Sequence, residues 1–330
     1  MKIIVDAFGG DNAPQEILLG CVKAQTELGI DIALAGDPAR IQAAARELGI
    51  ADAVGKMEIF PATDVISQED EPDSIVKRPE SSLAVGLQAL ADGKGDAFAS
   101  AGNSGALVVG ATAIVKRIKG VHRVGFAPIL PKQPGCFMLC DAGANTVCRP
   151  SMLLQFGIMG SEYMKRVMGV ANPRVGLANV GVEPHKGDDL RREAYRKLSE
   201  CDSIRFIGNV EARDIPYDAA DVIVSDGLTG NMLVKMYEGV AMAVLGLVKG
   251  VFKKSLKNKL AAALVLGDMK GLKKQMDYNE YGGAPIMGCS RPVFKIHGSA
   301  KATTVFNGLR LTKEYVDSGF TQAISEIIKK

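Results

Sequence analysis

Short apolar runs alternate with helix-length amphipathic segments along almost the whole of this chain. The apolar runs predict strands at residues 2–5, 30–35, 57–61, 97–101, 136–141, 174–180, 204–207 and 222–225. A loop and then a helical pattern follow most of them, as at 14–28, 38–48 and 106–116. This alternation predicts an α/β fold, with a mostly parallel sheet covered by helices. Because no linker or low-complexity tract divides residues 1–330, we expect a single two-lobed unit.

Composition excludes several classes of protein. The 330 residues are 47% hydrophobic and 23% charged, so the chain can build a core and is not disordered. The 40 basic and 37 acidic residues give a formal net charge of +3, which identifies no partner by itself. Aromatic residues make up 5% of the chain and Trp is absent, so we expect no nucleic-acid partner whose bases stack on the protein.

The cysteines and the apolar stretches bear on metal binding and on location. Six cysteines are scattered without a CxxC pair, and no His lies near Cys136, Cys140 and Cys148 at the spacing of zinc ligands. We therefore expect buried thiols, no metal and no cofactor. The first residues contain no apolar signal segment, and the longest apolar stretch, 240–248, is about half of a membrane span. These features predict an unexported, cytoplasmic protein.

The loops after the predicted strands share one chemistry. Each is small and rich in Gly, and each carries Asp, Asn, Ser or Thr; they are 6–14, 100–106, 141–145, 179–183 and 225–231, with a sixth at 281–285. Gly lets the backbone approach a ligand, and a helix N-terminus behind the loop offers N–H groups to an anion. Ligands of parallel sheets bind beyond the carboxyl ends of the strands, where these loops meet. Neither a P-loop nor a GxGxxG motif is present, so the pattern predicts a phosphate-using site of another kind.

The same loops resemble, block by block and in the same order, the phosphate acyltransferases of bacterial phospholipid synthesis, the PlsX family. The blocks that carry the resemblance are Val5-Asp6-Ala7-Phe8-Gly9-Gly10-Asp11-Asn12-Ala13-Pro14, Ser100-Ala101-Gly102-Asn103-Ser104-Gly105-Ala106-Leu107, Asp141-Ala142-Gly143-Ala144-Asn145, Asn179-Val180-Gly181-Val182-Glu183 with Lys186-Gly187, Phe206-Ile207-Gly208-Asn209-Val210-Glu211, Ser225-Asp226-Gly227-Leu228-Thr229-Gly230-Asn231, Glu280-Tyr281-Gly282-Gly283-Ala284-Pro285 and His297-Gly298-Ser299. Two positions depart from the family pattern. Phe8 stands where the family usually has Met, and Asn12 stands where it usually has His, so no role of that His is transferred to this chain.

The resemblance implies an enzyme that reversibly transfers a long-chain fatty acyl group from acyl carrier protein to inorganic phosphate. The acyl phosphate formed is then a substrate for a membrane acyltransferase that acylates glycerol 3-phosphate in phospholipid synthesis. The resemblance also implies a two-lobed, three-layer α/β/α sandwich, similar to isocitrate and isopropylmalate dehydrogenases and phosphotransacetylase, which forms a homodimer. The expected partners are therefore acyl carrier protein, inorganic phosphate, a second copy of the chain and the membrane acyltransferase.

Attack of phosphate on a thioester requires an oriented phosphate, stabilisation of the developing oxyanion and departure of a thiolate. We expect backbone N–H groups around Gly102 and Gly105, and around Gly227 and Gly230, to bind the phosphate. The hydroxyl groups of Ser104 and Thr229 are expected to donate to it as well. Other residues of the matching loops complete the expected substrate and phosphate site: Asp6, Gly9, Gly10, Asp11, Asn179, Glu183, Gly282 and Gly283.

Five side chains are the candidates for the chemistry itself. Asn103 and Asn231 are expected to donate to the oxyanion, and Lys186 to offset the charge of the phosphate, unless it is an exposed loop lysine. Asp226, like Asp6, is expected either to orient the donors or act as a base, or to cap the helix that follows. His297, after the strand-like run 292–296, is a candidate for protonating the thiolate, against a packing role.

Residues 248–276 form a basic amphipathic segment. They contain eight lysines and one acid, Asp268, and Phe252, Leu256, Leu260 and Leu264 recur at i+4. Three interpretations stay open: contact with an anionic membrane surface, docking of the acidic carrier protein, or an apolar stripe against a dimer partner with solvated lysines.

Other functions also stay open. A phosphotransacetylase-like enzyme acting on acyl-CoA shares the chemistry and the architecture, and a non-catalytic acyl-phosphate or lipid-binding scaffold belongs to another class. A metal-dependent decarboxylating dehydrogenase of the same fold requires clustered acids and an arginine set. Asp218, Asp221 and Asp226 are near one another in the chain, but no matching arginine set is evident.

Overall fold

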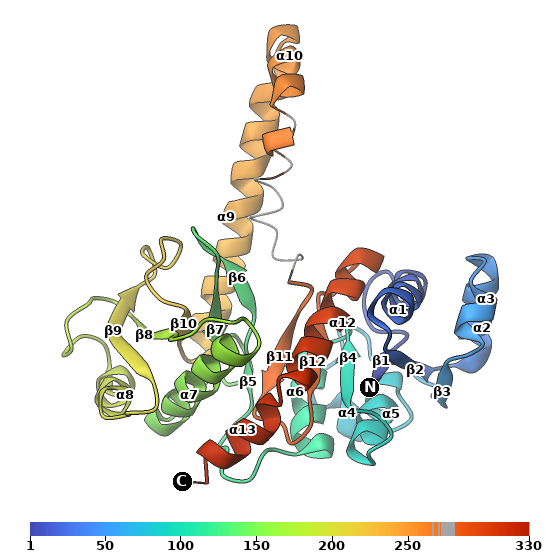
Figure 1. The fold of residues 1–330 in the computed structure, drawn as a ribbon, viewed down its shortest axis with the longest axis horizontal. Coiled ribbons are helices and arrows are strands. Elements are labelled where there is room, and N and C mark those ends of the chain that lie inside the picture. The colour runs from blue at the N-terminus through green and yellow to red at the C-terminus, as the bar shows by residue number, and fades with distance from the viewer. Residues whose placement is uncertain (266, 270, 272–280, 330) are drawn as a thin grey trace.

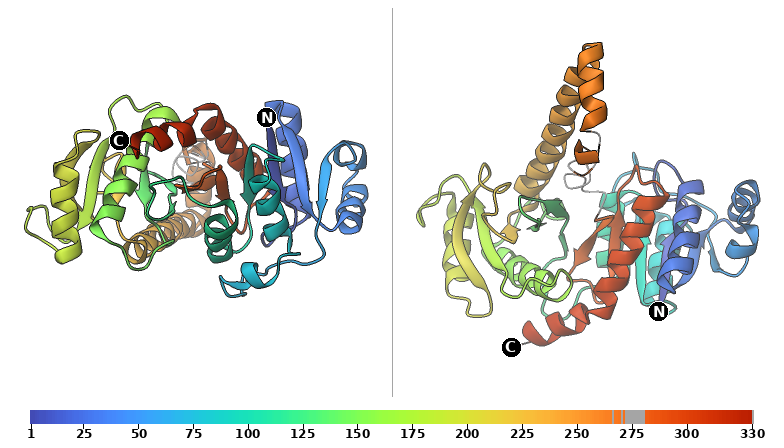
Figure 2. Two further views of the ribbon diagram at one scale, coloured as in Figure 1. Left: turned by 90° about the horizontal axis from the view of Figure 1, so that it is seen from below. Right: turned by 45° about the horizontal axis from the view of Figure 1, so that its top comes forward.

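The structure is a computed structural model that describes residues 1–265, 267–269, 271 and 281–329. Lys270, Lys273, Lys274 and Met276 of the basic segment and Glu280 of the predicted motif lie outside the described residues. Figures 1 and 2 show two lobes side by side, with a helical hairpin of α9 and α10 that stands out from the body. The chain crosses from the first lobe to the second after β5 and returns to the first with β11.

The first lobe is built on a seven-stranded sheet with the order β3-β2-β1-β4-β12-β11-β5. In it only β11 runs against its neighbours, among the strands that the structure describes. The elements of this lobe are β1 (Lys2–Asp6), α1 (Gln15–Leu28), β2 (Asp31–Gly36), α2 (Pro38–Glu47), α3 (Ala51–Val54), β3 (Glu58–Pro61), α4 (Ser74–Lys77), α5 (Ser82–Ala91), β4 (Ala97–Ser100), α6 (Ser104–Gly110), the π-helix η1 (Ala111–Val115), β5 (Gly125–Phe126), β11 (Gly283–Met287), β12 (Val293–Ile296), α12 (Ala302–Asp317) and α13 (Phe320–Ile327).

The second lobe is built on a five-stranded sheet with the order β6-β7-β10-β8-β9, in which β6 runs antiparallel to β7 and the other pairs are parallel. Its elements are β6 (Ile129–Pro131), β7 (Cys136–Cys140), α7 (Pro150–Arg166), β8 (Arg174–Asn179), α8 (Asp189–Ser199), β9 (Arg205–Glu211), β10 (Val222–Val224), α9 (Gly227–Lys253) and α10 (Leu256–Leu264).

Both sheets are the middle layer of a sandwich, because their side chains alternate between two apolar faces. In β1, Ile3 and Val5 belong to the core that includes α1 and α12, whereas Ile4 belongs to the core under α5. In β10, Val222 and Val224 pack with α7 on one face, and Ile223 packs on the other face with the first turns of α9. The predicted two-lobed α/β/α sandwich is therefore confirmed, with its strands divided between two sheets.

Two predicted segments differ from the structure. Residues 281–285, expected as a sixth loop after a strand, lead into β11. Because β11 is antiparallel to β12, its amino end lies at the same edge as the carboxyl ends of the parallel strands, so Gly282 and Gly283 still reach that edge. The helix expected at 106–116 begins at Ser104 as α6 and continues as the π-helix η1.

The basic segment also differs from the single amphipathic helix that we expect from its pattern. Helix α9 ends at Lys253, and the Ser255 hydroxyl caps a new helix, α10, by accepting from the backbone N–H of Asn258 at 3.1 Å. The i+4 stripe is therefore divided: Phe252 lies on α9, while Leu256, Leu260 and Leu264 lie exposed on α10. Within the described part of the chain, only α9 is long and apolar enough by length and composition to cross a membrane, with a mean hydropathy of 1.4.

Two cations and two carboxylates form an ion cluster at the amino end of the second sheet. The buried Lys132 ammonium lies 2.6 Å from Asp218 Oδ1 and 2.7 Å from Asp221 Oδ1, and Arg174 contacts both carboxylates as well. Burial raises the pKa of Asp221, but hydrogen bonds from Arg174 and Lys132 outweigh this and hold that pKa well below its ordinary value. Asp218 and Asp221 are thus occupied by cations, and no group of metal-ligating side chains occurs among the described residues.

Replacement of Asp221 by Ala is expected to lower the free energy of unfolding by about 3 kcal/mol, because it removes one of two partners of a buried lysine. Glu200→Ala is the control, since it breaks only an exposed pair with Arg196 and should cost less than about 1 kcal/mol. Urea unfolding followed by circular dichroism measures both. Equal effects of the two substitutions would show that the buried cluster contributes no more to the free energy of unfolding than an exposed ion pair does.

Candidate active site

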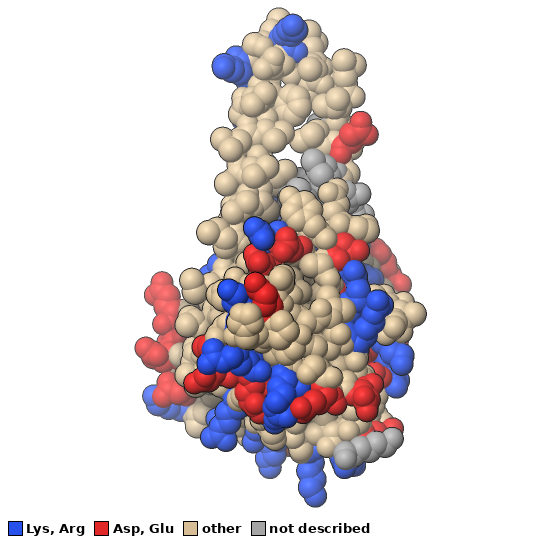
Figure 3. All heavy atoms as spheres, turned by 90° about the vertical axis from the view of Figure 1, so that its left-hand side faces the viewer, with Lys and Arg blue, Asp and Glu red and all other residues tan. Residues whose placement is uncertain are grey.

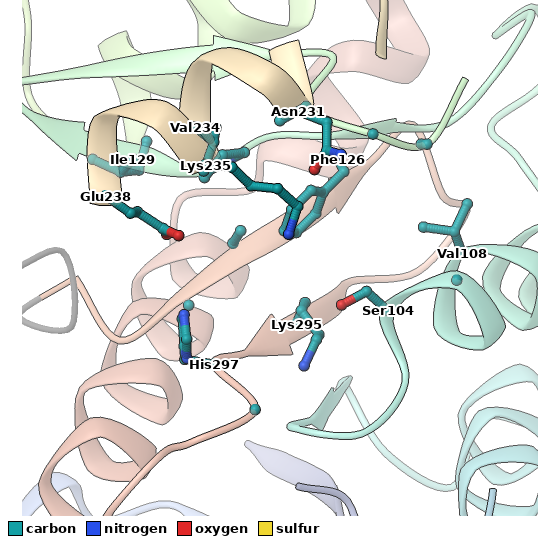
Figure 4. Close-up of a pocket in the computed structure, with 18 of the residues that line it drawn as sticks. Ser104, Val108, Phe126, Ile129, Asn231, Val234, Lys235, Glu238, Lys295 and His297 are labelled. Carbon is teal, nitrogen blue, oxygen red and sulfur yellow. The ribbon is translucent and has the colours of Figure 1, made fainter. Parts of the chain in front are cut away.

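A cavity of about 520 Å³ lies between the two lobes. Its polar lining consists of Ser104, Lys295 and His297 from the first lobe and Asn231, Lys235 and Glu238 from helix α9 of the second lobe. Figure 4 shows these two sets on opposite walls, with Phe126 between them. The apolar lining consists of Val108, Val109, Phe126, Ile129, Leu130 and Val234. The cavity therefore offers an apolar surface beside a set of charged and amide groups, the usual composition of a small-molecule site.

The structure brings together only part of the predicted site residues. Those that line the cavity are Ser104, Gly105, Asn231, Gly282, Gly283 and His297. The others are not in the lining: Asp6, Gly9, Gly10, Asp11, Gly102, Asn103, Asn179, Glu183, Lys186, Asp226, Gly227, Thr229 and Gly230.

Asn103, predicted to donate to an oxyanion, is engaged elsewhere. Its Nδ2 donates to the backbone carbonyls of Ser67, Gln68 and Asp70, and its Oδ1 caps α6 by accepting from the N–H of Ala106 at 3.0 Å. The side chain is buried. Asn103 therefore fixes segment 67–70 against α6 and leaves the exposed Ser104 to face the cavity.

The loop that follows β1 packs tightly on the loop that follows β4. Buried Asp6 accepts from the Ser100 hydroxyl at 2.8 Å and from the N–H of Phe8 at 3.2 Å, and burial raises the pKa of its carboxyl group above the ordinary value despite these hydrogen bonds. A Cβ on Gly9 would lie 2.6 Å from both Asp6 Oδ2 and the backbone nitrogen of Gly102. Gly9 is therefore needed for the contact between loops.

The same N-terminal loop also binds the segment after β12. The N–H of Asp11 donates to the Gly298 carbonyl at 2.9 Å, and Asn12 donates its amide to the carbonyls of Ser299 and Ala300. Asn12, where the family usually has His, thus holds the backbone just beyond His297. The Nδ1 of His297 lies 3.1 Å from the Ser299 hydroxyl, while its ring reaches the cavity.

The amino end of α9 is fixed by a carboxylate and an arginine. Asp226 caps the helix by accepting from the N–H and the hydroxyl of Thr229, and its Oδ2 lies 2.5 Å from Nη2 of Arg191. The N–H of Gly227 donates to the Asn145 carbonyl. A Cβ on Gly230 would lie 1.9 Å from the Asp141 carbonyl oxygen, so the helix can approach the first loop of this lobe only with Gly there. Of the two roles predicted for Asp226, the structure contains the cap.

A separate amide network holds the loop after β8. The Asn179 amide donates to the Lys186 carbonyl and to Asn209 Oδ1, and the Asn209 amide donates to the Glu183 carbonyl. The side chains of Glu183 and Lys186 are not in the lining of the cavity. Lys186 lies at the carboxyl end of the second sheet, on the same lobe as Asn231.

Sequence reasoning missed Lys295, Lys235 and Glu238. Lys295 is buried at the end of β12, and its Nζ donates to the carbonyls of Ala101 at 2.8 Å and Ile296 at 2.7 Å. Burial lowers its pKa to about 7, although Asp6 and Asp11 act in the opposite direction. The available signal was a single lysine inside the apolar run 292–296. Lys235 and Glu238 follow Asn231 at i+4 and i+7, the spacing of one helix face.

The cysteines near the cavity are not set up as nucleophiles. Burial raises the pKa of Cys148 to about 11, and the pKa of Cys140 is raised well above its ordinary value by burial and by the nearby Asp141. Neither thiol ionises at neutral pH, so neither supplies the thiolate that a nucleophilic cysteine must provide.

Comparison with known proteins gives a consistent result along the whole chain. Residues 1–323 match the family model described as "Fatty acid synthesis protein". The phosphate acyltransferase of Acetivibrio thermocellus is 45% identical over 329 residues, which cover 99% of this chain and 95% of that protein. The phosphate acyltransferase of Listeria monocytogenes serotype 4a is 41% identical over 333 residues, covering 100% of this chain and 97% of that protein.

Solved structures share the fold. A phosphotransacetylase from Streptococcus pyogenes superposes with a TM-score of 0.66 at 14% identity, covering 96% of this chain and 94% of that one. A 4-hydroxythreonine-4-phosphate dehydrogenase from Burkholderia phymatum superposes with a TM-score of 0.52 at 14% identity, covering 95% of this chain and 97% of that one. Both likenesses concern architecture alone.

Asp226→Ala is expected to lower the free energy of unfolding by about 2 kcal/mol, because it removes the cap of α9 and leaves a half-buried Arg191 without its main partner. Asp37→Ala is the matched control, since Asp37 caps α2 at the surface by hydrogen bonds alone and should cost about 1 kcal/mol. Chemical unfolding compares the two. If Asp37→Ala is as costly as Asp226→Ala, the Arg191 ion pair contributes nothing to the stability of this end of α9.

Proposed function

This chain belongs to the fatty acid synthesis protein family, whose curated relatives are phosphate acyltransferases, and we propose that it moves a long-chain fatty acyl group from acyl carrier protein to inorganic phosphate. It is an enzyme, an acyltransferase of fatty acid and phospholipid synthesis. The observation that carries this function is the 45% sequence identity to the Acetivibrio thermocellus phosphate acyltransferase, which extends over 99% of the chain and includes both walls of the cavity. We place the reaction in the cytoplasm, at the inner face of the membrane where its product is consumed.

The lining of the cavity suits the two halves of the reaction. The apolar residues Val108, Val109 and Ile129 can accept an acyl chain, and the polar residues on the facing walls can bind phosphate and the thioester carbonyl. A phosphate oxygen then attacks the carbonyl carbon, the C–S bond breaks, and the carrier leaves as a thiolate. Because a thiolate is a good leaving group, positioning and electrostatic stabilisation are sufficient, and no acyl-enzyme is required.

Asn231 is the group that we assign to the oxyanion. It lies in the second turn of α9, whose start is fixed by the Asp226 cap, and Figure 4 shows its amide directed into the cavity. Within the described part of the chain, the Asn231 amide donates no hydrogen bond to a side chain or a carbonyl, whereas Asn103 uses its own amide on three carbonyls. Lys186 stays our candidate for an additional cation contributed by the second lobe, although its side chain is not in the lining of the cavity.

The function is tested by incubating the purified protein with palmitoyl-acyl carrier protein, with and without inorganic phosphate, and by following free carrier thiol and acyl phosphate. Phosphate-dependent release of thiol with formation of acyl phosphate supports the proposal. Turnover of palmitoyl-CoA in a parallel reaction, without turnover of the carrier-protein thioester, favours the phosphotransacetylase-like alternative. Saturable binding of acyl phosphate without any turnover favours the non-catalytic scaffold.

Asn231→Ala is expected to lower kcat about 100-fold with little change in stability, because it removes one preorganised donor to the oxyanion. Met232→Ala is the matched control, since Met232 is the next residue of the same helix and its side chain is exposed. Steady-state thiol release with the carrier-protein substrate measures both variants. Equal kcat values for Asn231→Ala and the unmodified enzyme would remove Asn231 from the reaction.

The hairpin of α9 and α10 is where we place the second copy of the chain. Its outer half is exposed and apolar, and the residues of α9 that recur on one side are Met232, Met236, Val240, Leu247 and Val251. An apolar stripe of this length is rarely left in water, and the same stripe on a second copy covers its outer part, from Met236 to Val251, symmetrically and leaves Met232 exposed. Figure 3 shows that this stalk is mostly uncharged and carries Lys or Arg side chains at its far end. We assign those exposed lysines, which include Lys253, Lys254 and Lys257, to an anionic partner, either the membrane surface or the carrier protein.

The double variant Val240→Glu/Leu247→Glu is expected to be monomeric in sedimentation analysis, because it places charge within the apolar stripe. The matched variant Lys253→Glu/Lys254→Glu/Lys257→Glu should remain a dimer. It should lose sedimentation with anionic vesicles if its partner is the membrane, or show a higher KM for the carrier-protein substrate if its partner is the carrier. A stripe variant that remains dimeric would place the subunit contact elsewhere.

A further inference from the structure

Lys295 occupies an unusual place for a cation. It is the third residue of β12, which lies between β4 and β11 inside the seven-stranded sheet, and it pairs with Ser100 on one side and Ala284 on the other. The residue is 7% exposed. Both neighbouring strands are buried, so its side chain can reach solvent only along the carboxyl edge of the sheet, where the cavity lies.

The surroundings of the Lys295 amino group contain dipoles and no ion-pair partner. Its Nζ donates to the Ala101 carbonyl at 2.8 Å and to the Ile296 carbonyl at 2.7 Å, which leaves one of three N–H positions of the ammonium form without a partner among the described hydrogen bonds. The carboxylates of Asp6 and Asp11 influence it through space, but neither forms a salt bridge with it in the described part of the chain. Burial without a carboxylate partner lowers the pKa of this amine to about 7.

The contrast with Lys132 is informative. Lys132 is equally buried, but two carboxylates lie within 2.7 Å of its ammonium group, so its charge is balanced inside the fold. Lys295 has no such balance and borders a cavity that receives an anion under the proposed function. Among the described residues that line the cavity, Lys295 is the one Lys or Arg of the first lobe. Lys235, on the opposite wall, is exposed and lies near Glu238.

We propose that Lys295 is a catalytic residue that binds inorganic phosphate through its amino group and takes a proton from it. The proposal rests on the proposed function, because it assigns one residue to that reaction. In the empty site above pH 7 the amine is mainly neutral and needs no counterion. When dihydrogen phosphate enters, the amine takes one proton, which leaves an ammonium group paired with hydrogen phosphate dianion.

The proton and the negative charges are conserved through the remaining steps. An oxygen of the dianion attacks the thioester carbonyl carbon, the C–S bond breaks, and acyl phosphate monoanion and the carrier thiolate are formed. The ammonium group of Lys295 returns its proton to the thiolate, so the amine is neutral again and the carrier leaves as a thiol. The hydrogen phosphate dianion is retained in the cavity because it forms next to the Lys295 ammonium group. It is also well placed to attack the thioester carbonyl carbon.

The test compares Lys295→Met with Lys235→Met, which removes the lysine of the opposite wall. Lys295→Met should raise the KM for phosphate at least about tenfold with an unchanged KM for the acyl-carrier substrate, a loss of about 1.4 kcal/mol or more in phosphate binding. Lys235→Met should change the KM for phosphate less. Added ethylamine should restore part of the activity of the shorter variant Lys295→Ala, which leaves room for the amine, and a purely structural role of the side chain does not predict this rescue.

The pH profile supplies a second readout. In the unmodified enzyme kcat/KM for phosphate should fall as the pH rises above 7, because dihydrogen phosphate then loses to solvent the proton that the neutral amine of Lys295 takes from it. In Lys295→Met this fall should disappear, and kcat/KM should rise to a plateau as dianion forms. Suppose that the wild-type enzyme is active and that Lys295→Met has the same KM for phosphate and the same pH profile as the wild type. That result overturns the inference about Lys295 and leaves the proposed function standing. Wild-type enzyme without phosphate-dependent thiol release overturns the function itself.

A measurement on the unmodified protein covers the case of a variant that does not fold. With lysine labelled by ¹³C at Cε, one resonance should titrate near pH 7 in the absence of phosphate. At pH 8, addition of inorganic phosphate should move that resonance to the position of a charged lysine. A resonance that titrates near pH 7 and does not respond to phosphate contradicts the proposal.

Discussion

The parallel pairing of β12 with β4 is the interaction on which the first wall of the cavity depends. It joins Val293, Phe294 and Lys295 to Phe98, Ala99 and Ser100, although almost 200 residues of chain lie between the two strands. Both strands are buried, so their N–H and C=O groups must be satisfied by each other, and the chain has to return from the second lobe to do so. This return brings Lys295 and His297 to the loop that carries Ser104. Without it the cavity would have one wall.

The opposite wall depends on the start of one helix. Asp226, Thr229 and Arg191 fix the first turn of α9, and Gly230 lets that turn lie against the Asp141 carbonyl. Asn231, Lys235 and Glu238 then follow on one helix face. Many of the small and polar residues in the loop motifs therefore act one step behind the cavity: they set the positions of strands and helices, and those elements present the reactive groups.

The fold could be predicted from the sequence because two signals indicate the same elements along the chain: the spacing of apolar residues and the residue types of the loops between them. The strands at 2–5, 97–101 and 222–225 are found within a residue or two, and the loops after them do lie at the edge where the cavity opens. The division into two sheets could not be predicted, since it depends on which strands pair across long stretches of sequence. Lys295 was missed for a similar reason. A lysine in a short apolar run looks like an edge position, and only the pairing with β4 and β11 makes it a buried cation at the site.

Roles of individual polar residues were harder to predict than their location. Asn103 and Asp226 stand in Gly-rich loops as a substrate-binding residue would, yet their side chains are used by neighbouring backbone groups. From sequence alone an Asn that caps a helix and an Asn that faces a cavity look the same, because the difference lies in which partners the fold brings within 3 Å. Asn231 differs from Asn103 in this respect, since it follows a helix start that is already capped by Asp226.

Helix α9 is a continuous rod of 27 residues, about 40 Å long at 1.5 Å per residue. Its inner turns form one wall of the cavity, and its outer turns stand free of the body with α10 folded against them. A rod of this kind transmits tilt from one end to the other, with the capped turn at Asp226 as its pivot. A contact that tilts the outer end of this rod would therefore also change the distance between Asn231 and Lys295, and so the width of the cavity between the two lobes.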